Sequence, residues 1–276
     1  MGESQFCGGY SRYVALGDSQ TEGLWDGDDH TGVYGFADRL AVMLDTLHPG
    51  IAYANLAVRS RRIRDVLDEQ LPAALDMEPD LITSCIGMND VTRPGRTFDR
   101  ALADLDYLHD RLAESGATIV TTTFPDLARI LPVGRLIAGR VVEINEVIRT
   151  AAARHAFRLV DLYGAPSMID PETWSIDRVH GSPRGHALFA AAAAEALGLS
   201  GSNHDWANAR PDVVQPGFRS RLYSQGLWAQ NLLMPWLWRH FRGLSGGTGR
   251  GPKRPVLDGL QGLEGVRSWS VGSEAE

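Results

Sequence analysis

The chain of 276 residues is almost without lysine and cysteine. Lys253 is the single lysine among 27 basic residues, a bias that fits a GC-rich genome and implies no mechanism. The two cysteines are Cys7, in the N-terminal segment, and Cys85, inside an apolar run. Two cysteines in these places predict neither a disulfide framework nor a cysteine-rich zinc site.

Long apolar runs and a secretory signal are also lacking. No run reaches the ~18 apolar residues from which a membrane-spanning helix is predicted, and residues 1–9 contain neither a basic residue nor an apolar core. The net charge of -7 argues against a general nucleic-acid-binding protein. With 43% hydrophobic and 22% charged residues, the composition is that of a soluble globular protein with a sizeable core. We therefore expect a cytoplasmic location.

Short apolar runs alternate with helical patterns along the first 200 residues. The runs, each predicted to be a strand, are 13–16, 51–56, 81–86, 117–124 and 157–162. The segments with apolar residues at helical spacing are 33–47, 63–71, 98–113, 141–153 and 183–197. This alternation predicts repeated βα units and a five-stranded parallel sheet covered on both faces, which is a flavodoxin-like three-layer α/β/α fold. One domain is expected over residues 1–200.

Residues 201–276 are predicted to form a C-terminal extension, partly helical and with a mobile end. Within it, the stretch 227–242 is strongly apolar and rich in tryptophan, but it contains Pro235 and ends in basic residues. This stretch fits either a helix packed on the domain or a contact with a membrane surface or a partner protein. The glycine-rich stretch 243–251 is not a phosphate loop, because no Gly-Lys-Ser/Thr follows it.

Polar side chains follow the predicted strands, at the edge where ligands bind in open α/β sheets. Ser19 follows the first run, Asn55 ends the second, and Asn89 follows the third. A serine in this position fits either a nucleophile or the N-cap of the next helix. The amide of Asn89 fits either a donor to a developing oxyanion or an ordinary turn.

A candidate general base follows the fifth strand, at Asp177 and His180. An aspartate three residues before a histidine can fold its carboxylate back onto one ring nitrogen and leave the other nitrogen facing a serine, as in a catalytic triad. The same residues also fit a surface loop with unrelated charges. Because Ser19, Asn89 and His180 are all predicted at one edge of the sheet, together they favour an active site with a nucleophilic serine.

Three sequence blocks, in this order, resemble those of the GDSL, or SGNH, hydrolase family. They are GDSxTxG at residues 17–23, GxND at 87–90 and DxxH at 177–180, and the resemblance spans residues 12–197. It implies a flavodoxin-like fold and hydrolysis of acyl esters through an acyl-enzyme, without metal or cofactor. It also implies that Ser19 is the nucleophile and His180 the general base and then acid, and that Asp177 orients His180.

The resemblance further implies three oxyanion donors, which are the backbone N–H of Ser19, a backbone N–H of the second block and the side chain of Asn89. The second block departs from the family pattern, because Ser60 stands five residues after Asn55, where the family has glycine. Serine keeps the N–H but is strained by about 1 to 2 kcal/mol if the turn requires a positive φ. The arginines around Ser60 fit either a solvated face or a contact with an acidic or phosphate-bearing substrate; they are Arg59, Arg61, Arg62 and Arg64.

The predicted function is therefore hydrolysis of a small-molecule or lipid-like ester by a serine nucleophile. The same triad would also serve a carbohydrate deacetylase or an acyltransferase, and the fold alone would serve a non-catalytic binding module. A flavin- or nucleotide-binding domain is disfavoured, because no Gly-x-Gly-x-x-Gly follows the first strand. Acyl chain length, head group and acyl acceptor depend on loops 24–32, 91–97 and 125–140, and the sequence leaves them and the oligomeric state open.

Overall fold

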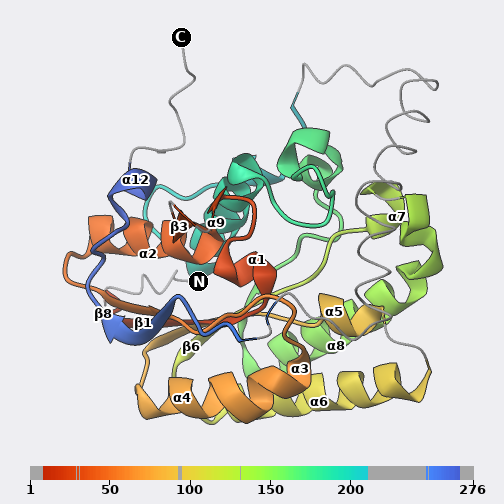
Figure 1. Cartoon of the computed structure of the whole chain (residues 1–276), viewed down its shortest axis with the longest axis horizontal. Coiled ribbons are helices and arrows are strands. Elements are labelled where there is room, and N and C mark those ends of the chain that lie inside the picture. The colour runs from red at the N-terminus through yellow and green to blue at the C-terminus, as the bar shows by residue number, and fades with distance from the viewer. Residues whose placement is uncertain are drawn as a thin grey trace, which may run out of the picture.

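The structure of the chain is a computed structural model (Figure 1), and it describes residues 9–28, 30, 32–92, 95–130, 132–210, 247 and 249–267. Its main sheet has the strand order β7-β6-β5-β1-β4-β8. The strands are β1 Arg12–Gly17, β4 Ala52–Asn55, β5 Leu81–Cys85, β6 Thr118–Thr122, β7 Arg158–Val160 and β8 Arg254–Asp258. The first five in chain order are parallel to one another and lie in the flavodoxin-like order, so the predicted fold class is confirmed.

The sheet contains one strand more than the five that were predicted. β8 pairs antiparallel with β4 at the edge of the sheet, and it belongs to the C-terminal extension. Edge strands need no buried apolar run, and β8 has none, since its Val256 is 61% exposed. The division of the chain near residue 200 stays a prediction, but the extension contributes to the sheet of the first domain.

Helices cover both faces of the sheet (Figure 1). α2 and α9 pack against each other on one face, whereas α3, α4, α6 and α8 lie on the other. These helices are α2 Phe36–Leu47, α3 Ile63–Asp65, α4 Leu71–Asp76, α6 Arg96–Ala113, α8 Ala138–His155 and α9 Pro183–Leu197. The shorter elements include α1 Ser19–Glu22, α5 Met88–Val91, α7 Leu127–Ile130, α12 Glu264–Arg267 and a hairpin of β2 Gly27–Asp28 and β3 Gly32–Val33. Each long helix lies where helical spacing of apolar residues predicted one.

The core is centred on β1, whose apolar run is fully buried. Tyr13, Val14, Ala15 and Leu16 are 0% exposed, because β1 lies between β4 and β5 and is covered on both faces. A strand in this position needs a continuous apolar run rather than an alternating one. The hydroxyl of Tyr13 is paired with that of Thr83 at 2.9 Å, so the strand buries no unpaired polar side chain there.

A buried glutamine fixes the end of β1. The side chain of Gln70 donates to the carbonyl oxygen of Gly17 and accepts from the N–H of Gly17, both at 2.9 Å. Gln70 is 5% exposed and ends a π-helical turn, Val66–Gln70, between α3 and α4. One side chain thus holds both polar backbone groups of the residue two positions before Ser19.

Two sequence predictions fall outside the described residues. The tryptophan-rich stretch 227–242, with its proposed membrane or protein contact, is one of them, and residues 268–276, at the end that was predicted to be mobile, are the other. Among the helices that the structure describes, none is long and apolar enough to cross a membrane.

Gln70→Leu is expected to lower the free energy of unfolding by about 2 to 4 kcal/mol, because the buried N–H and C=O of Gly17 lose their partners. Denaturant unfolding followed by circular dichroism measures this loss. The control is Asp76→Leu, a similar change at an exposed position at the end of α4, which should cost less than about 0.5 kcal/mol. A Gln70→Leu variant as stable as the control would show that these bonds do not hold the strand end.

Candidate active site

The turn after β1 brings Ser19 to the carboxyl edge of the sheet. Gly17 has a φ of 154°, and a Cβ there would lie 2.3 Å from the hydroxyl oxygen of Thr21 and 2.5 Å from a carbonyl oxygen of β5, so only glycine fits. Asp18 then caps α1 by accepting a backbone N–H of the first turn at 3.2 Å. The N-cap is therefore Asp18, and the hydroxyl of Ser19 is left for another partner.

That partner is His180, which lies 161 residues further along the chain. Ser19 Oγ is 2.7 Å from His180 Nε2, and His180 Nδ1 is 2.7 Å from Asp177 Oδ2. The side chains of His180 and Asp177 are 20% and 17% exposed, so the arrangement is open enough to meet a substrate. The structure thus brings together the three residues that the sequence nominated.

The charge state of Asp177 follows from its contacts. Burial raises the pKa of Asp177, but the hydrogen bonds from the ring and backbone N–H of His180 and from the backbone N–H of Val179 outweigh this effect and hold the pKa well below its ordinary value. A carboxylate only accepts hydrogen bonds, so Nδ1 of His180 carries the ring proton. The lone pair of Nε2 then faces the hydroxyl of Ser19, which is the tautomer that base catalysis requires.

A closed loop holds Asp177 and His180 in place. An isolated antiparallel bridge between Trp174 and Gly181 closes the loop, and the N–H of Ser175 donates to the carbonyl oxygen of His180 at 2.8 Å. The hydroxyl of Ser175 donates to Asp177 Oδ1 at 2.7 Å. The fold-back that the Asp-x-x-His spacing predicted is therefore present, and it is not a loop with unrelated charges.

Trp25 makes a contact that no sequence pattern indicated. Its indole N–H donates to Asp177 Oδ2 at 2.7 Å, and that oxygen also accepts the Nδ1–H of His180. Trp25 is 43% exposed and has a φ of 74°, a conformation that bulky residues rarely adopt. The only signal for it in the sequence is an aromatic residue inside loop 24–32, one of the loops expected to set specificity.

Two backbone N–H groups are available as oxyanion donors. Within the described residues, the N–H of Ser19 and the N–H of Ser60 donate no hydrogen bond. Ser60 has a φ of 68°, so the turn does place a serine in the left-handed conformation that glycine adopts most readily, at a cost of about 1 to 2 kcal/mol. The carbonyl oxygen of the next residue, Arg61, accepts from the side chain of Asn89 at 2.9 Å, which holds the turn beside α5.

Asn89 lies at the predicted edge, but both of its amide protons already have acceptors. Its NH₂ donates to Asp18 Oδ2 at 3.0 Å and to the carbonyl oxygen of Arg61 at 2.9 Å. An amide has two protons, so Asn89 must exchange or share one of these bonds before it can donate to an oxyanion. Its contribution to an oxyanion site stays a proposal.

Arg59 and Arg64, two arginines of the second block, lie in different environments. The guanidinium of Arg59 donates to Glu22 Oε1 at 2.6 and 2.9 Å, and its backbone N–H donates to Glu22 Oε2 at 2.6 Å. The Arg59 side chain is 13% exposed, whereas that of Arg64 is 64% exposed and pairs with Asp68. Arg59 is therefore neither solvated nor free for an anionic substrate; it ties the Ser60 turn to the end of α1.

Asp18 is a buried acid at the centre of the site. It is 5% exposed, and burial raises the pKa of Asp18 to about 6. The backbone N–H of Gln20 opposes the rise, and the carboxylates of Asp90 and Glu22 add to it. A fraction of Asp18 side chains is therefore protonated in mildly acidic solution.

The comparison with known proteins agrees with this geometry. A model of the GDSL-like Lipase/Acylhydrolase family matches residues 15–188. The chain belongs to this family. The resemblance read from the three sequence blocks is confirmed, and the GDSL-like protein is a hydrolase of ester bonds.

Solved structures share the fold of this GDSL-like hydrolase. LAE5, an α/β hydrolase enzyme from the metagenome of Lake Arreo, Spain, shares 24% sequence identity with this chain and superposes with a TM-score of 0.56. The match covers 68% of this chain and 95% of LAE5. Axe2, an acetylxylan esterase from Geobacillus stearothermophilus, is 20% identical with a TM-score of 0.58, over 72% of this chain and 97% of its own. Other Axe2 structures are described as catalytic mutants, with an aspartate, a serine or a histidine replaced by alanine. No curated protein matches the chain in sequence.

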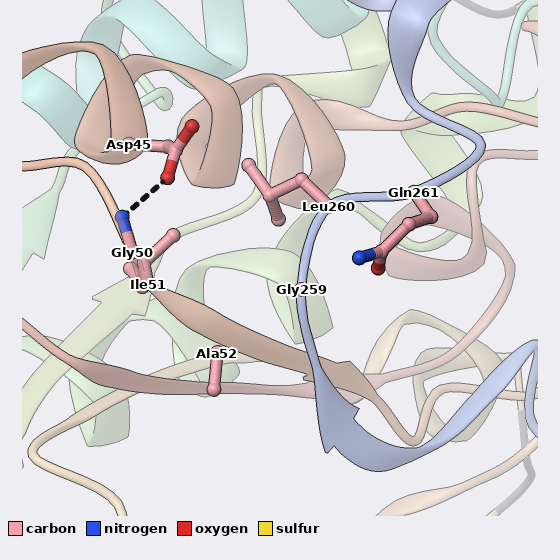
Figure 2. Close-up of a pocket in the computed structure, with 7 residues that line it drawn as sticks. All are labelled: Asp45, Gly50, Ile51, Ala52, Gly259, Leu260 and Gln261. Carbon is pink, nitrogen blue, oxygen red and sulfur yellow. Dashed lines mark hydrogen bonds between the residues drawn. The ribbon is translucent and has the colours of Figure 1, made fainter.

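A cavity of about 320 Å³ in the GDSL-like hydrolase lies away from Ser19, Asp177 and His180 (Figure 2). It is lined by Asp45, Gly50, Ile51, Ala52, Gly259, Leu260 and Gln261. Ala52 pairs with Arg12 at the start of β1, whereas Ser19 follows the end of that strand. The cavity therefore lies at the amino ends of the parallel strands, and Ser19 lies at their carboxyl ends. Within the described ranges, no group of three or more His, Cys, Asp or Glu side chains is arranged to hold a metal ion.

Asp18→Asn is expected to change how stability depends on pH. In the unfolded chain Asp18 has its ordinary pKa of about 3.9, so the folded protein holds this proton more tightly. The stabilisation of the folded state by the proton on Asp18 is fully present below about pH 4 and is lost as the pH rises through about 6. Between pH 4 and pH 7 the unfolding free energy of the wild type should therefore fall by about 2 kcal/mol relative to that of the variant. Denaturant unfolding at both pH values tests this, and a difference between the two proteins that is independent of pH would refute it.

Proposed function

We propose that this chain hydrolyses acyl esters through a covalent acyl-enzyme, with Ser19 as the nucleophile, His180 as the general base and then acid, and Asp177 as the residue that orients His180. The observation that carries the proposal is the pair of 2.7 Å contacts from Ser19 Oγ to His180 Nε2 and from His180 Nδ1 to Asp177 Oδ2. They meet the distance that proton transfer between nucleophile and base requires.

The first half of the reaction forms the acyl-enzyme. Ser19 Oγ bonds to the ester carbonyl carbon while its proton moves to Nε2 of His180, and the carbonyl oxygen becomes an oxyanion. The imidazolium, stabilised by Asp177, then gives the proton to the alkoxide leaving group as the ester C–O bond breaks. In the second half a water molecule takes the place of the alcohol: His180 removes its proton, the acid product leaves, and the hydroxyl of Ser19 is restored.

The oxyanion of each half-reaction needs donors that are already oriented. The backbone N–H groups of Ser19 and Ser60, which have no acceptor among the residues that the structure describes, are our first two candidates. The side chain of Asn89 is the third, and it would exchange its bond to Asp18 or to the carbonyl oxygen of Arg61 for one to the oxyanion. Protonation of Asp18 would weaken its hold on Asn89 and make this exchange easier.

A carbohydrate deacetylase is the second candidate. The shared fold with the acetylxylan esterase Axe2 supports it. An acyltransferase would use the same acyl-enzyme with an acceptor other than water. Initial rates on p-nitrophenyl acetate, a long-chain p-nitrophenyl ester and acetylated xylo-oligosaccharides separate these activities.

Ser19→Ala is expected to lower kcat on p-nitrophenyl acetate by about 10⁴-fold or more, because the members of a triad act as a unit. A fluorophosphonate should label the wild type at Ser19 and leave the variant unlabelled, as read by peptide mass spectrometry. Ser115→Ala, in the turn that follows α6, is the control and should keep both rate and label. If Ser19→Ala retained a rate within about tenfold of the wild type, Ser19 would not be the nucleophile.

Trp25→Phe is expected to lower kcat by about 3- to 10-fold with little change in KM. The variant keeps an aromatic ring but removes the N–H that donates to Asp177 Oδ2, so Asp177 and His180 are less firmly oriented. Steady-state kinetics measures the effect. Ile176→Ala, which removes a 70% exposed side chain beside Asp177, is the matched control. Equal values of kcat for Trp25→Phe and the wild type would exclude a role for the indole N–H.

A further inference from the structure

The only lysine of the chain lies against the helix that carries Ser19, although it belongs to the C-terminal extension. Lys253 Nζ donates to the carbonyl oxygen of Glu22 at 2.6 Å, to that of Val33 at 3.0 Å and to Asp38 Oδ2 at 2.5 Å. Glu22 ends α1, Val33 is in β3, and Asp38 is in the first turn of α2. One ammonium therefore joins three elements that surround the turn after β1.

The ion pair with Asp38 is buried. Asp38 is 0% exposed, and its carboxylate also accepts the N–H of Gly35 at 2.7 Å and the hydroxyl of Tyr53 at 3.2 Å. The Lys253 side chain is 18% exposed. A carboxylate removed from water needs a cation close by, and the extension supplies this one from a position 215 residues away. This contact anchors the strap formed by residues 247 and 249–258.

The anchored strap reaches the proposed oxyanion turn through Glu22. The carbonyl oxygen of Glu22 accepts from Lys253, and its carboxylate accepts the backbone N–H and the guanidinium of Arg59. Arg59 immediately precedes Ser60, so Glu22 lies between the strap and the turn that offers the second oxyanion N–H. A shift of the end of α1 would move Ser19 and the Ser60 turn relative to each other.

A second observation places the strap directly on that turn. A Cβ on Gly247 would lie 2.3 Å from the carbonyl oxygen of Arg59, so the backbone of the strap is packed against the residue before Ser60. In Figure 1 the blue segment that leads into β8 lies beside α1. The strap thus contacts the Ser60 turn at Gly247, the end of α1 at Lys253 and the edge of the sheet through β8.

We propose that Lys253 is a positioning residue of the active site and that the strap of the C-terminal extension completes the oxyanion site by holding the end of α1 and the Ser60 turn. This proposal rests on the proposed function, in which Ser19 is the nucleophile. Lys253 contacts neither substrate nor reacting atoms. It acts through Glu22 and Arg59, and its effect is on the geometry of the transition state rather than on substrate affinity.

The kinetic test uses the full-length chain and p-nitrophenyl acetate. Lys253→Met should lower kcat by about 10- to 100-fold and change KM by less than about threefold, since small displacements of catalytic groups cost this much. Lys253→Arg, which keeps the charge and several donors, should recover most of the lost rate. Arg154→Met is the control: Arg154 is in the last turn of α8, outside the strap, and pairs with Asp106 and Asp110, so kcat should be preserved.

A pair of variants separates positioning from loss of a buried ion pair. Lys253→Met leaves Asp38 without its cation and is prone to unfold, whereas the double variant Lys253→Met with Asp38→Asn removes both charges. The double variant should fold and still show the low kcat, because the bond to Glu22 is absent. Asp38→Asn alone keeps the bonds of the ammonium to the carbonyl oxygens of Glu22 and Val33 and should therefore retain clearly more kcat than the double variant. If Asp38→Asn lost as much kcat as the double variant, or if the double variant kept wild-type kcat, the proposal would fail.

The single lysine also allows a chemical test of the contact. Acetylation by an amine-directed reagent, followed by peptide mass spectrometry, should modify Lys253 slowly in the folded protein and rapidly after denaturation. Rapid modification of Lys253 in the folded, active protein would overturn the proposal. Fluorophosphonate labelling of the wild type at Ser19 is measured in parallel. Absence of that label would refute the proposed function, whereas labelling together with undiminished kcat in the Lys253 variants would refute only the role of the strap.

Discussion

Ser19, the proposed nucleophile, stands at the start of a helix of only four residues, Ser19–Glu22, and a helix so short does not hold its shape in water on its own. Contacts from other parts of the chain must therefore fix it. The turn before it allows no side chain at Gly17, and Gln70 holds the backbone of that glycine from the far face of the sheet. At the other side, the side-chain oxygen of Gln20 accepts the N–H of Gly181 at 3.2 Å, which joins the short helix to the loop of the proposed base.

Charged and polar groups dominate these contacts. The carboxylate of Asp18 accepts a hydrogen bond from the side chain of Asn89, and the carboxylate of Glu22 accepts one from the guanidinium of Arg59. The carbonyl oxygen of Glu22 accepts a hydrogen bond from the ammonium of Lys253. Buried ion pairs add little net stability, because the desolvation of both charges offsets their attraction, but breaking one of them is costly. Such pairs define a geometry more than they stabilise a fold. In this protein they define where Ser19 lies relative to the donors expected to face the oxyanion.

The sequence predicted the parts of the fold that bury apolar surface and the parts of the site that lie in compact motifs. The five parallel strands were found because β1 and its neighbours are continuous apolar runs, and Asp177 was found because its spacing to His180 has a chemical reason. β8 was missed because an edge strand with an exposed Val256 carries no such pattern. Trp25 and Lys253 were missed because their contacts, to Asp177 and to Glu22, join distant segments and follow from tertiary packing alone.

The most direct test of the account is the structure of the protein after reaction with a fluorophosphonate, whose phosphonyl oxygen stands in for the oxyanion. We expect a covalent bond from phosphorus to Ser19 Oγ, with the phosphonyl oxygen within about 3.1 Å of the backbone N–H of Ser19 and that of Ser60. We also expect Asn89 to turn from Asp18 or Arg61 toward this oxygen. A phosphonyl oxygen that points into solvent, away from the Ser60 turn, would contradict the proposed oxyanion site, and a bond to any other residue would contradict the assignment of Ser19.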